Sequence, residues 1–206
     1  MKTSDYWSSK HLKYLKKGYD FHNPSIFILD NLSYFSKDKR VLDLGCGTGR
    51  DAVFLAKRGL DVDAVDLNTE AAQSEVYKSG AALNLISADM SNPIHLEKGK
   101  YDVIYSILGI HYFGNKRTKE ILNEIHSALK PGGYFMCLLN SKADAEYDES
   151  QESQDGLISI HGINKQFFTA LEFQDLVSGK FKTILSDNNG ATDKDSNNLV
   201  RFIGQK

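Results

Sequence analysis

A glycine-rich turn and three aspartates are spaced as groups around a bound nucleoside would be. The stretch VLDLGCGTGR, residues 41–50, runs from an apolar strand-like segment into three glycines separated by single residues, and it contains Asp43. Asp66 and Asp89 stand at the ends of two further strand-like segments. A carboxylate at such a position accepts hydrogen bonds from the hydroxyls of a ribose or from an exocyclic amine. Met90, which follows, offers an apolar surface for a purine ring.

The glycine turn matches neither of two phosphate-binding motifs. A P-loop needs lysine and then serine or threonine after its last glycine, whereas Arg50 follows Gly49 here. A dinucleotide-binding fingerprint needs a glycine at position 50, which Arg50 occupies. A tight turn without a ligand would explain the glycines alone, and helix caps would explain each aspartate alone. The turn and the acids together favour a nucleoside pocket without a diphosphate.

Hydrophobic periodicity predicts alternating strands and helices along the chain. The predicted strands are 40–44, 61–67, 83–89, 101–109 and 134–140, and the predicted helices are 50–59, 68–80, 117–130 and 164–179. Asn68 is expected to cap the second helix, and the PGG sequence at 131–133 to end the third. Segments 181–187 and 198–204 are expected to pair as an antiparallel hairpin. This order predicts an α/β fold whose mostly parallel sheet binds ligands at its carboxyl end.

Composition and charge restrict the function. The chain has 206 residues and a net charge of −2, with a pI of about 6.3, so no overall basic field favours nucleic acid. Cys46 and Cys137 lie far apart in the sequence, and neither a disulfide framework nor a metal site is expected. No apolar run reaches the length of a membrane span. We therefore expect a cytoplasmic protein of one domain with no membrane partner.

Five segments occur in the order found in a known enzyme family: VLDLGCGTGR, VDAVDLN, SADM, YDVIYSILGIHYF and LKPGGYFM. Over residues 39–140 the chain resembles the class I S-adenosylmethionine-dependent methyltransferases. Among them it is most similar to compact small-molecule enzymes of the tellurite-resistance and thiopurine type. The resemblance implies a Rossmann-like α/β fold, with a seven-stranded, mostly parallel sheet, helices on both faces and an antiparallel last strand. From its length and pattern we expect one compact domain, in which a helical N-terminal cap at 1–38 precedes the methyltransferase domain at 39–206.

The resemblance also implies a binding site for S-adenosyl-L-methionine. The expected cofactor-binding residues are Asp43, Gly45, Cys46, Gly47, Arg50, Asp66, Leu67, Asp89, Met90 and Ser106. The backbone of 45–47 would lie against the methionyl part, Asp66 would hold the ribose hydroxyls, and Asp89 would accept the adenine amine. The Ser106 region would contribute a backbone carbonyl to the cofactor's ammonium group. Cys46 is expected to pack in the turn rather than to react.

The activity that the resemblance implies is methyl transfer to a small-molecule acceptor. His111 and Tyr112, just past the fourth predicted strand, are the candidate catalytic residues, since a histidine can act as a base near neutral pH. Packing is the alternative role for both, and His161 is a second candidate base. The tetrapeptide SILG stands where relatives that methylate nucleic-acid bases carry an NPPY-like sequence, so nucleic acid is disfavoured as a partner. A methyltransferase acting on tRNA or protein, and a cofactor-binding regulatory protein without transferase activity, stay as alternatives.

Two segments are expected to cover the site. Residues 141–160, which include the acidic stretch 143–156, are expected to form a mobile lid, because methyl transfer benefits from closure. Aromatic side chains of the N-terminal segment would approach the sulfonium through cation–π attraction, although ordinary packing explains them equally well. These aromatic residues are Tyr6, Trp7, Tyr14 and Tyr19.

Overall fold

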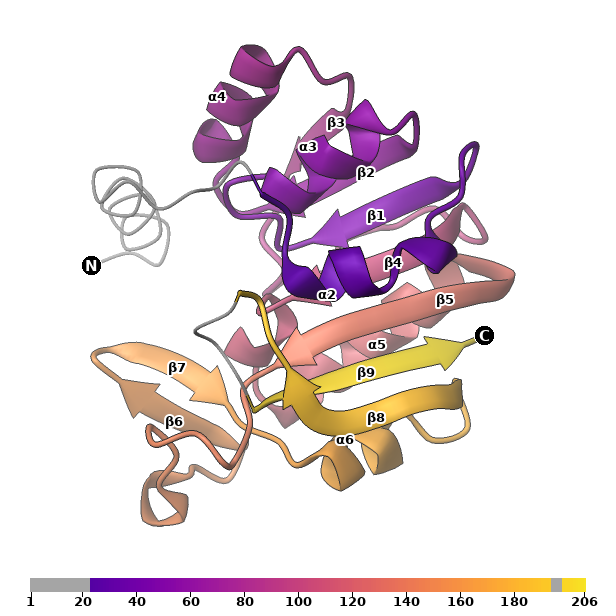
Figure 1. Cartoon of the computed structure of the whole chain (residues 1–206). Helices are drawn as coiled ribbons and strands as arrows, with labels where there is room; N and C mark the ends of the chain where they lie inside the picture. The colour runs from indigo at the N-terminus through magenta and orange to yellow at the C-terminus, as the bar shows by residue number, and fades with distance from the viewer. Residues whose placement is uncertain (1–22, 194–197) are drawn as a thin grey trace.

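The structure is a computed structural model that describes residues 23–193 and 198–206. Within this part, seven strands form one sheet in the order β3-β2-β1-β4-β5-β9-β8 (Figure 1). The strands are β1 (Arg40–Leu44), β2 (Asp61–Asp66), β3 (Asn84–Ser87), β4 (Tyr101–Ile107), β5 (Leu129–Leu139), β8 (Lys182–Gly190) and β9 (Leu199–Gln205). Strand β9 is antiparallel to both neighbours, and the other pairings are parallel. The predicted sheet with an antiparallel last strand is therefore confirmed.

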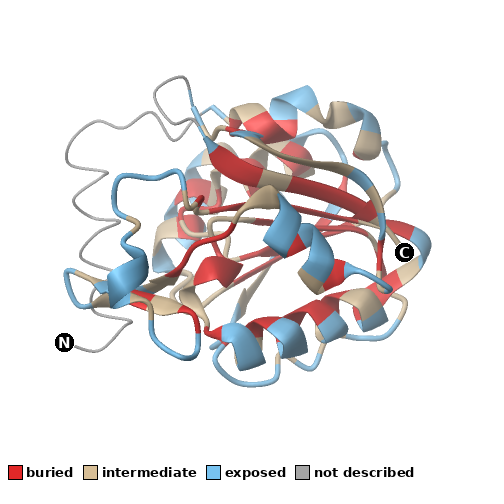
Figure 2. Ribbon diagram, turned by 90° about the horizontal axis from the view of Figure 1, so that it is seen from below, coloured by how far each residue is buried: buried red, intermediate tan, exposed pale blue. Residues whose placement is uncertain are grey.

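Helices cover both faces of the sheet, as predicted. They are α2 (Ile26–Asp30), α3 (Arg50–Lys57), α4 (Glu70–Ser79), α5 (Asn115–Ala128) and α6 (Ala170–Val177), with the short 3-10 helices η1 (Leu32–Tyr34), η2 (Ile110–Tyr112) and η3 (Glu149–Gln151). Strand residues alternate between two buried clusters: Leu42 packs with α5 and α6, and Val41 packs with α2 and α3. Buried residues accordingly fill the strands and the inner faces of the helices (Figure 2). A parallel sheet buried on both faces requires these near-continuous apolar strands.

The N-terminal cap predicted at 1–38 is described from residue 23 onward. Tyr6, Trp7, Tyr14 and Tyr19 lie outside the described residues. Ser25 caps α2, because its side chain accepts a hydrogen bond from the Ile28 N–H, and the Ser25 N–H donates to Asp51 Oδ1 at 2.6 Å. These contacts attach the lead-in to α3, the helix that follows the glycine turn.

Two helix boundaries predicted from the sequence are wrong. The helix expected at 117–130 ends at Ala128, and the PGG sequence at 131–133 lies inside β5 instead of ending the helix. Gly132 has φ +77°, and its N–H donates to the Lys206 carbonyl. The turn-forming residues therefore bend β5, and the bent part stays hydrogen-bonded to the C-terminal residue of the chain. The cap position of α4 is Thr69. Asn68 still accepts a hydrogen bond from the Glu70 N–H at 2.9 Å.

The helix predicted at 164–179 is also wrong at its start. Strands β6 (Leu157–Ile160) and β7 (Ile163–Gln166) form a separate antiparallel hairpin, and α6 begins at Ala170. Thr169 and Glu172 form a capping box there, which is the local signal that marks the true start of the helix. The hairpin lies at the end of the sheet towards which β1 and β5 point (Figure 1).

Candidate functional site

A cavity of about 730 Å³ opens at the carboxyl ends of β1, β2 and β4. Strand order reverses between β1 and β4, because the chain proceeds from β1 to β3 on one side and from β4 to β5 on the other. Open α/β sheets bind ligands at such a position, since the loops leaving the two central strands diverge there. Except for Ser106, every residue expected to bind the cofactor lines this cavity.

The glycine turn brings bare main chain to the cavity. Gly45, Gly47 and Gly49 have φ of +82°, +55° and +78°, a region that residues with a Cβ rarely adopt. A Cβ on Gly45 would lie 3.0 Å from the Cα of Gly109, in the loop after β4. The N–H groups of Gly45 and Cys46 both donate to the Val65 carbonyl, at 2.8 and 3.0 Å. The turn is thus fixed to the end of β2 and pressed against the next loop.

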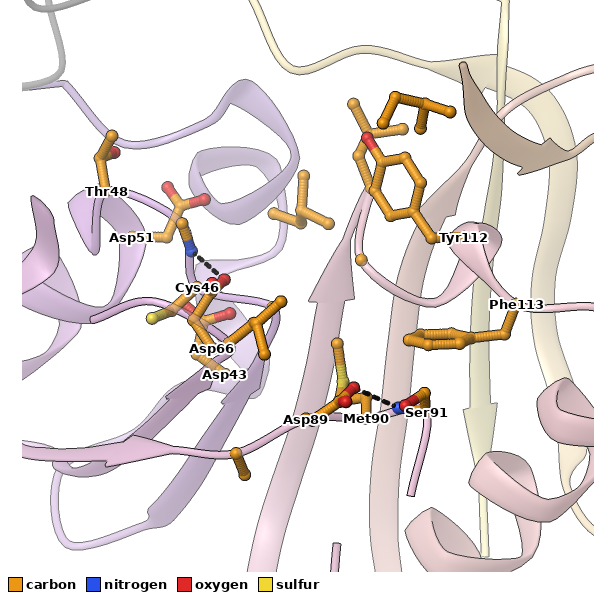
Figure 3. A pocket seen from close by; sticks show the side chains of 18 of the residues that line it. Asp43, Cys46, Thr48, Asp51, Asp66, Asp89, Met90, Ser91, Tyr112 and Phe113 are labelled. Atoms are coloured by element: carbon orange, nitrogen blue, oxygen red, sulfur yellow. Dashed lines mark hydrogen bonds between the residues drawn. The ribbon is translucent and has the colours of Figure 1, made fainter. Parts of the chain in front are cut away.

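Asp66 connects the end of β2 to the glycine turn. Its Oδ2 accepts a hydrogen bond from the Gly47 N–H at 2.9 Å (Figure 3). Its Oδ1 accepts one from the Asn68 N–H at 3.1 Å. Each carboxylate oxygen has a second lone pair, so these bonds leave acceptor capacity for a ligand. The arrangement holds the carboxylate at the cavity wall, beside the bare backbone of the turn.

Asp89 and Met90 form the wall contributed by the loop after β3. The Oδ1 atom of Asp89 accepts a hydrogen bond from the Ser91 N–H at 2.8 Å, and its Oδ2 accepts one from Asn92 Nδ2 at 3.3 Å. Asp89 is exposed, whereas Met90 is buried next to it. Tyr112 and Phe113 lie across the cavity from Cys46 and Asp66 (Figure 3). The cavity therefore has polar groups at the strand ends and an aromatic wall opposite.

Two buried carboxyl groups lie beneath the turn. Asp43 accepts a hydrogen bond from the Tyr105 hydroxyl at 2.8 Å. Burial raises the pKa of Asp43 well above its usual value, and the nearby Asp51 raises it further. Burial also raises the pKa of Asp51, against the opposing effect of Arg50 and of the hydrogen bonds from Ser25. Both carboxyl groups line the cavity. Because they are buried, their neutral forms are favoured more than they would be in water.

Ser106 and His111 lie behind the cavity wall. The Ser106 hydroxyl is buried and donates to the Leu44 carbonyl at 2.7 Å, which joins β4 to the end of β1. His111 is 1% exposed, and its ring centroid lies 4.0 Å from that of Tyr112. Tyr112 lines the cavity. His161 is exposed in the turn between β6 and β7, with φ +51°, next to Gly162, which does line the cavity.

The sequence did not reveal the part of the wall that comes from distant segments. Gly162, Ile163 and Asn164, at the β6–β7 turn, line the cavity, as do Thr192 and Asp193. No sequence motif marks any of these residues. Gly162, Ile163 and Asn164 reach the cavity because β6 and β7 pair and bring the turn between them to it. The segment 141–160, expected to act as a lid, contributes no residue to the cavity lining among the described residues.

Two broader properties concern the part of the chain that the structure describes. None of its helices is long and apolar enough to cross a membrane. Its histidine, cysteine, aspartate and glutamate side chains form no group that could hold a metal ion.

Comparisons with known proteins agree with this geometry. Residues 41–133 match the family model described as a methyltransferase domain. The chain is 29% identical over 111 residues to an uncharacterised methyltransferase of Synechocystis, covering 52% of this chain and 49% of that protein. It is also 29% identical over 111 residues to a ubiquinone biosynthesis O-methyltransferase of Pectobacterium carotovorum, covering 52% and 46%. The chain thus spans about half the length of these curated relatives.

A solved structure extends the likeness over nearly the whole chain. A 1,6-didemethyltoxoflavin-N1-methyltransferase of Burkholderia thailandensis, determined with bound 1,6-didemethyltoxoflavin and S-adenosylhomocysteine, superimposes with a TM-score of 0.74. The match covers 98% of this chain and 86% of that one at 21% identity. The fold is therefore that of the class I methyltransferases. The sequence likeness to a methyltransferase domain is confined to residues 41–133, just under half of the chain.

Proposed function

We propose that this chain binds S-adenosylmethionine in the cavity and transfers its methyl group to a small-molecule acceptor. One observation carries the proposal: the glycine turn, Asp66 and Asp89 border a single cavity at the switch point of the sheet. Asp66 has acceptor capacity for a ribose diol, and Asp89 for the adenine amine. Gly45 and Gly47 bring main chain without side chains to the cavity, and the methionyl part would lie against this backbone.

The chain's own residues would serve mainly to bind, orient and exclude water. When bound, S-adenosylmethionine supplies a methyl group that its sulfonium sulfur already activates. Tyr112, Phe113 and Ile163 give the cavity apolar walls, which exclude water and hold an acceptor in line with the reacting group. His111 would act through the ring of Tyr112, which it contacts, and not by direct contact with an acceptor. A base is required only for an acceptor that is protonated in its prevailing form.

The size of the cavity and the likeness to a structure with a bound small molecule support a small acceptor. A volume of about 730 Å³ lies within the range of about 300–1,000 Å³ that is usual for small-molecule sites. Gly162, Ile163 and Asn164 of the β6–β7 turn line the same cavity as Tyr112, and we assign the acceptor to the part that these residues border.

A cofactor-binding protein without transferase activity is the second candidate. The observation that favours it is the burial of His111, the first candidate base, behind the cavity wall. Turnover separates the two functions. Labelled S-adenosylmethionine should lose its methyl group to at least one member of a panel of thiols, phenols and metalloid oxyanions. Cofactor binding without turnover across the panel would favour the second candidate.

The β6–β7 turn supplies a test of the acceptor side. Ile163→Ala removes apolar surface from that wall, and we expect it to raise the KM for the acceptor about tenfold, since burying such a side chain contributes about 1.5 kcal/mol or more. The affinity for S-adenosylhomocysteine should stay within about twofold. Ser159→Ala, on the exposed part of the same hairpin, is the matched control. Equal losses of acceptor and cofactor affinity would place Ile163 at the cofactor instead.

A further inference from the structure

Arg117 lies in the first turn of α5 and contacts the loop that follows β3. A cation in the first turn of a helix opposes the helix dipole, so local sequence rules do not favour arginine there. The side chain is 13% exposed. Its Nε donates to the Met90 carbonyl and its Nη2 to the Asn92 carbonyl, each at 2.7 Å. Both acceptors are main-chain groups of the loop that carries Asp89.

Glu124 completes this contact from the next turns of the same helix. Arg117 Nη1 donates to Glu124 Oε1 at 2.6 Å, and Glu124 Oε2 accepts a hydrogen bond from the Ile94 N–H at 2.9 Å. The Arg117–Glu124 pair therefore holds three main-chain groups between residues 90 and 94. A guanidinium presents its donors in a rigid planar fork, so the two carbonyls are fixed relative to one another as well as to α5.

We propose that Arg117 is a positioning residue for adenine recognition, an inference that rests on the proposed cofactor site. Arg117 does not line the cavity, whereas Asp89, Met90 and Ser91 do. By fixing the Met90 carbonyl and the chain that follows it, the Arg117–Glu124 pair sets where the Asp89 carboxylate and the Met90 main chain face the base. Without this support, the Asp89 carboxylate and the Met90 main chain would lose the fixed spacing that is needed to select an exocyclic amine.

The first experiment measures the loop without any cofactor. Amide hydrogen exchange of residues 89–95 should be faster in Arg117→Met than in the parent protein, because three loop contacts are lost or weakened. Glu120→Gln is the matched control, since Glu120 also pairs with Arg117 but is 47% exposed and lies 3.3 Å from it. Its exchange should match the parent protein. Unchanged exchange in Arg117→Met, or equal acceleration in Glu120→Gln, would overturn the proposal.

The second experiment measures selection of the base. Calorimetry should show that Arg117→Met weakens binding of S-adenosylhomocysteine about tenfold. Binding of S-inosylhomocysteine, which lacks the exocyclic amine, should weaken about twofold, so the preference between the two ligands shrinks. A merely structural role would weaken both ligands equally and leave the preference unchanged, which would overturn the proposal. Arg117→Lys, which keeps the charge but not the fork, should give an intermediate preference and covers the case in which Arg117→Met fails to fold.

The two experiments also separate the positioning role from the proposed function. A parent protein that binds neither ligand would contradict the cofactor site and, with it, adenine recognition. A parent protein that prefers S-adenosylhomocysteine, together with an Arg117→Met variant that keeps the same preference, would contradict the positioning role alone.

Discussion

At the scale of single residues, the glycine turn acts through its backbone and not through the one reactive side chain that it carries. Burial raises the pKa of the Cys46 thiol well above its usual value, and the charges of Asp43 and Asp66 raise it further. The thiol form, which is a poor nucleophile, is therefore favoured at neutral pH. Cys46 instead packs against the core cluster that contains Ala52 and Leu55.

Cys46→Ala should accordingly leave cofactor binding almost unchanged. We expect the affinity for S-adenosylhomocysteine to stay within about twofold, because the backbone of the turn is retained. The free energy of unfolding should fall by about 1 kcal/mol, since a partly buried sulfur that packs against the core cluster is removed. Calorimetry and urea unfolding measure the two quantities. A loss of affinity beyond tenfold, with stability unchanged, would show that the sulfur itself contacts the ligand.

The local sequence predicts that acids stand at the strand ends. It does not predict how the residues after β4 are oriented. Asp66 and Asp89 follow directly from the strand pattern, because the carboxyl ends of parallel strands meet at one edge. His111 and Tyr112 are adjacent in sequence, yet the first is buried and the second lines the cavity. The 3-10 helix η2 determines which ring faces the ligand, and no periodicity in three residues predicts it.

At the scale of elements, the site depends on a close approach of the loops after β1 and β4. A Cβ on Gly109 would lie 2.6 Å from both the Leu44 carbonyl and the Ser106 hydroxyl oxygen. The Leu44 carbonyl is main chain and cannot rotate away. The two loops can therefore meet only where one carries no side chain, and the cavity is formed at that junction.

Gly109→Ala is predicted to separate these loops. The added methyl group should lower the free energy of unfolding by about 1–3 kcal/mol, which is the usual cost of overpacking. It should also weaken S-adenosylhomocysteine binding, because the Gly45 backbone shifts with it. Gly179→Ala is a control in which the new Cβ meets no atom within 4 Å, although its φ of +76° adds some backbone strain. A Gly109→Ala protein with unchanged stability and affinity would contradict the close approach.

The β6–β7 hairpin is an element that the local sequence does not predict. The sequence predicts that residues 164–166 begin a helix, but they pair with β6 across a short turn. Residue spacing within INKQ does not distinguish a polar strand from a helical turn. The hairpin is then anchored far from its own sequence: Gln166 Nε2 donates to Asn115 Oδ1 at 2.6 Å, and the Thr118 hydroxyl donates to Gln166 Oε1 at 3.1 Å. The position of the β6–β7 turn at the cavity therefore follows from the folded structure and not from the local sequence.

At the scale of the whole molecule, the cavity lies at the carboxyl end of the sheet, and a stabilising cluster of polar side chains around Asp63 lies near the amino end. Asp63 is buried and joins the amino ends of neighbouring strands: it accepts a hydrogen bond from the Tyr101 hydroxyl at 2.8 Å and one from Asn84 Nδ2 at 3.0 Å. Lys100 Nζ lies 2.8 Å from its carboxylate. Burial alone would raise the pKa of Asp63, but the hydrogen bonds from Lys100, Asn84 and Tyr101 outweigh it and lower the pKa to about 2.

This pKa predicts how stability depends on pH. Because the pKa of Asp63 is lower in the folded state, its stabilising contribution is fully present above about pH 4 and is lost as pH falls towards 2. Asp63→Asn should lower the free energy of unfolding by about 3 kcal/mol at pH 7 and flatten the pH dependence between 4 and 2. Urea unfolding across that range measures both effects. A variant with the same slope as the parent protein would assign the acid sensitivity to other carboxylates.

We propose that the strand-end acids and the glycine turn form a binding site for the adenosine part of S-adenosylmethionine. Isothermal titration of S-adenosylhomocysteine into the parent protein and into Asp66→Ala tests it most directly. The parent protein should bind one equivalent, and Asp66→Ala should bind at least about tenfold more weakly, since the carboxylate supports both the ribose and the Gly47 N–H. A parent protein that does not bind, or an Asp66→Ala protein that binds equally well, would contradict the claim.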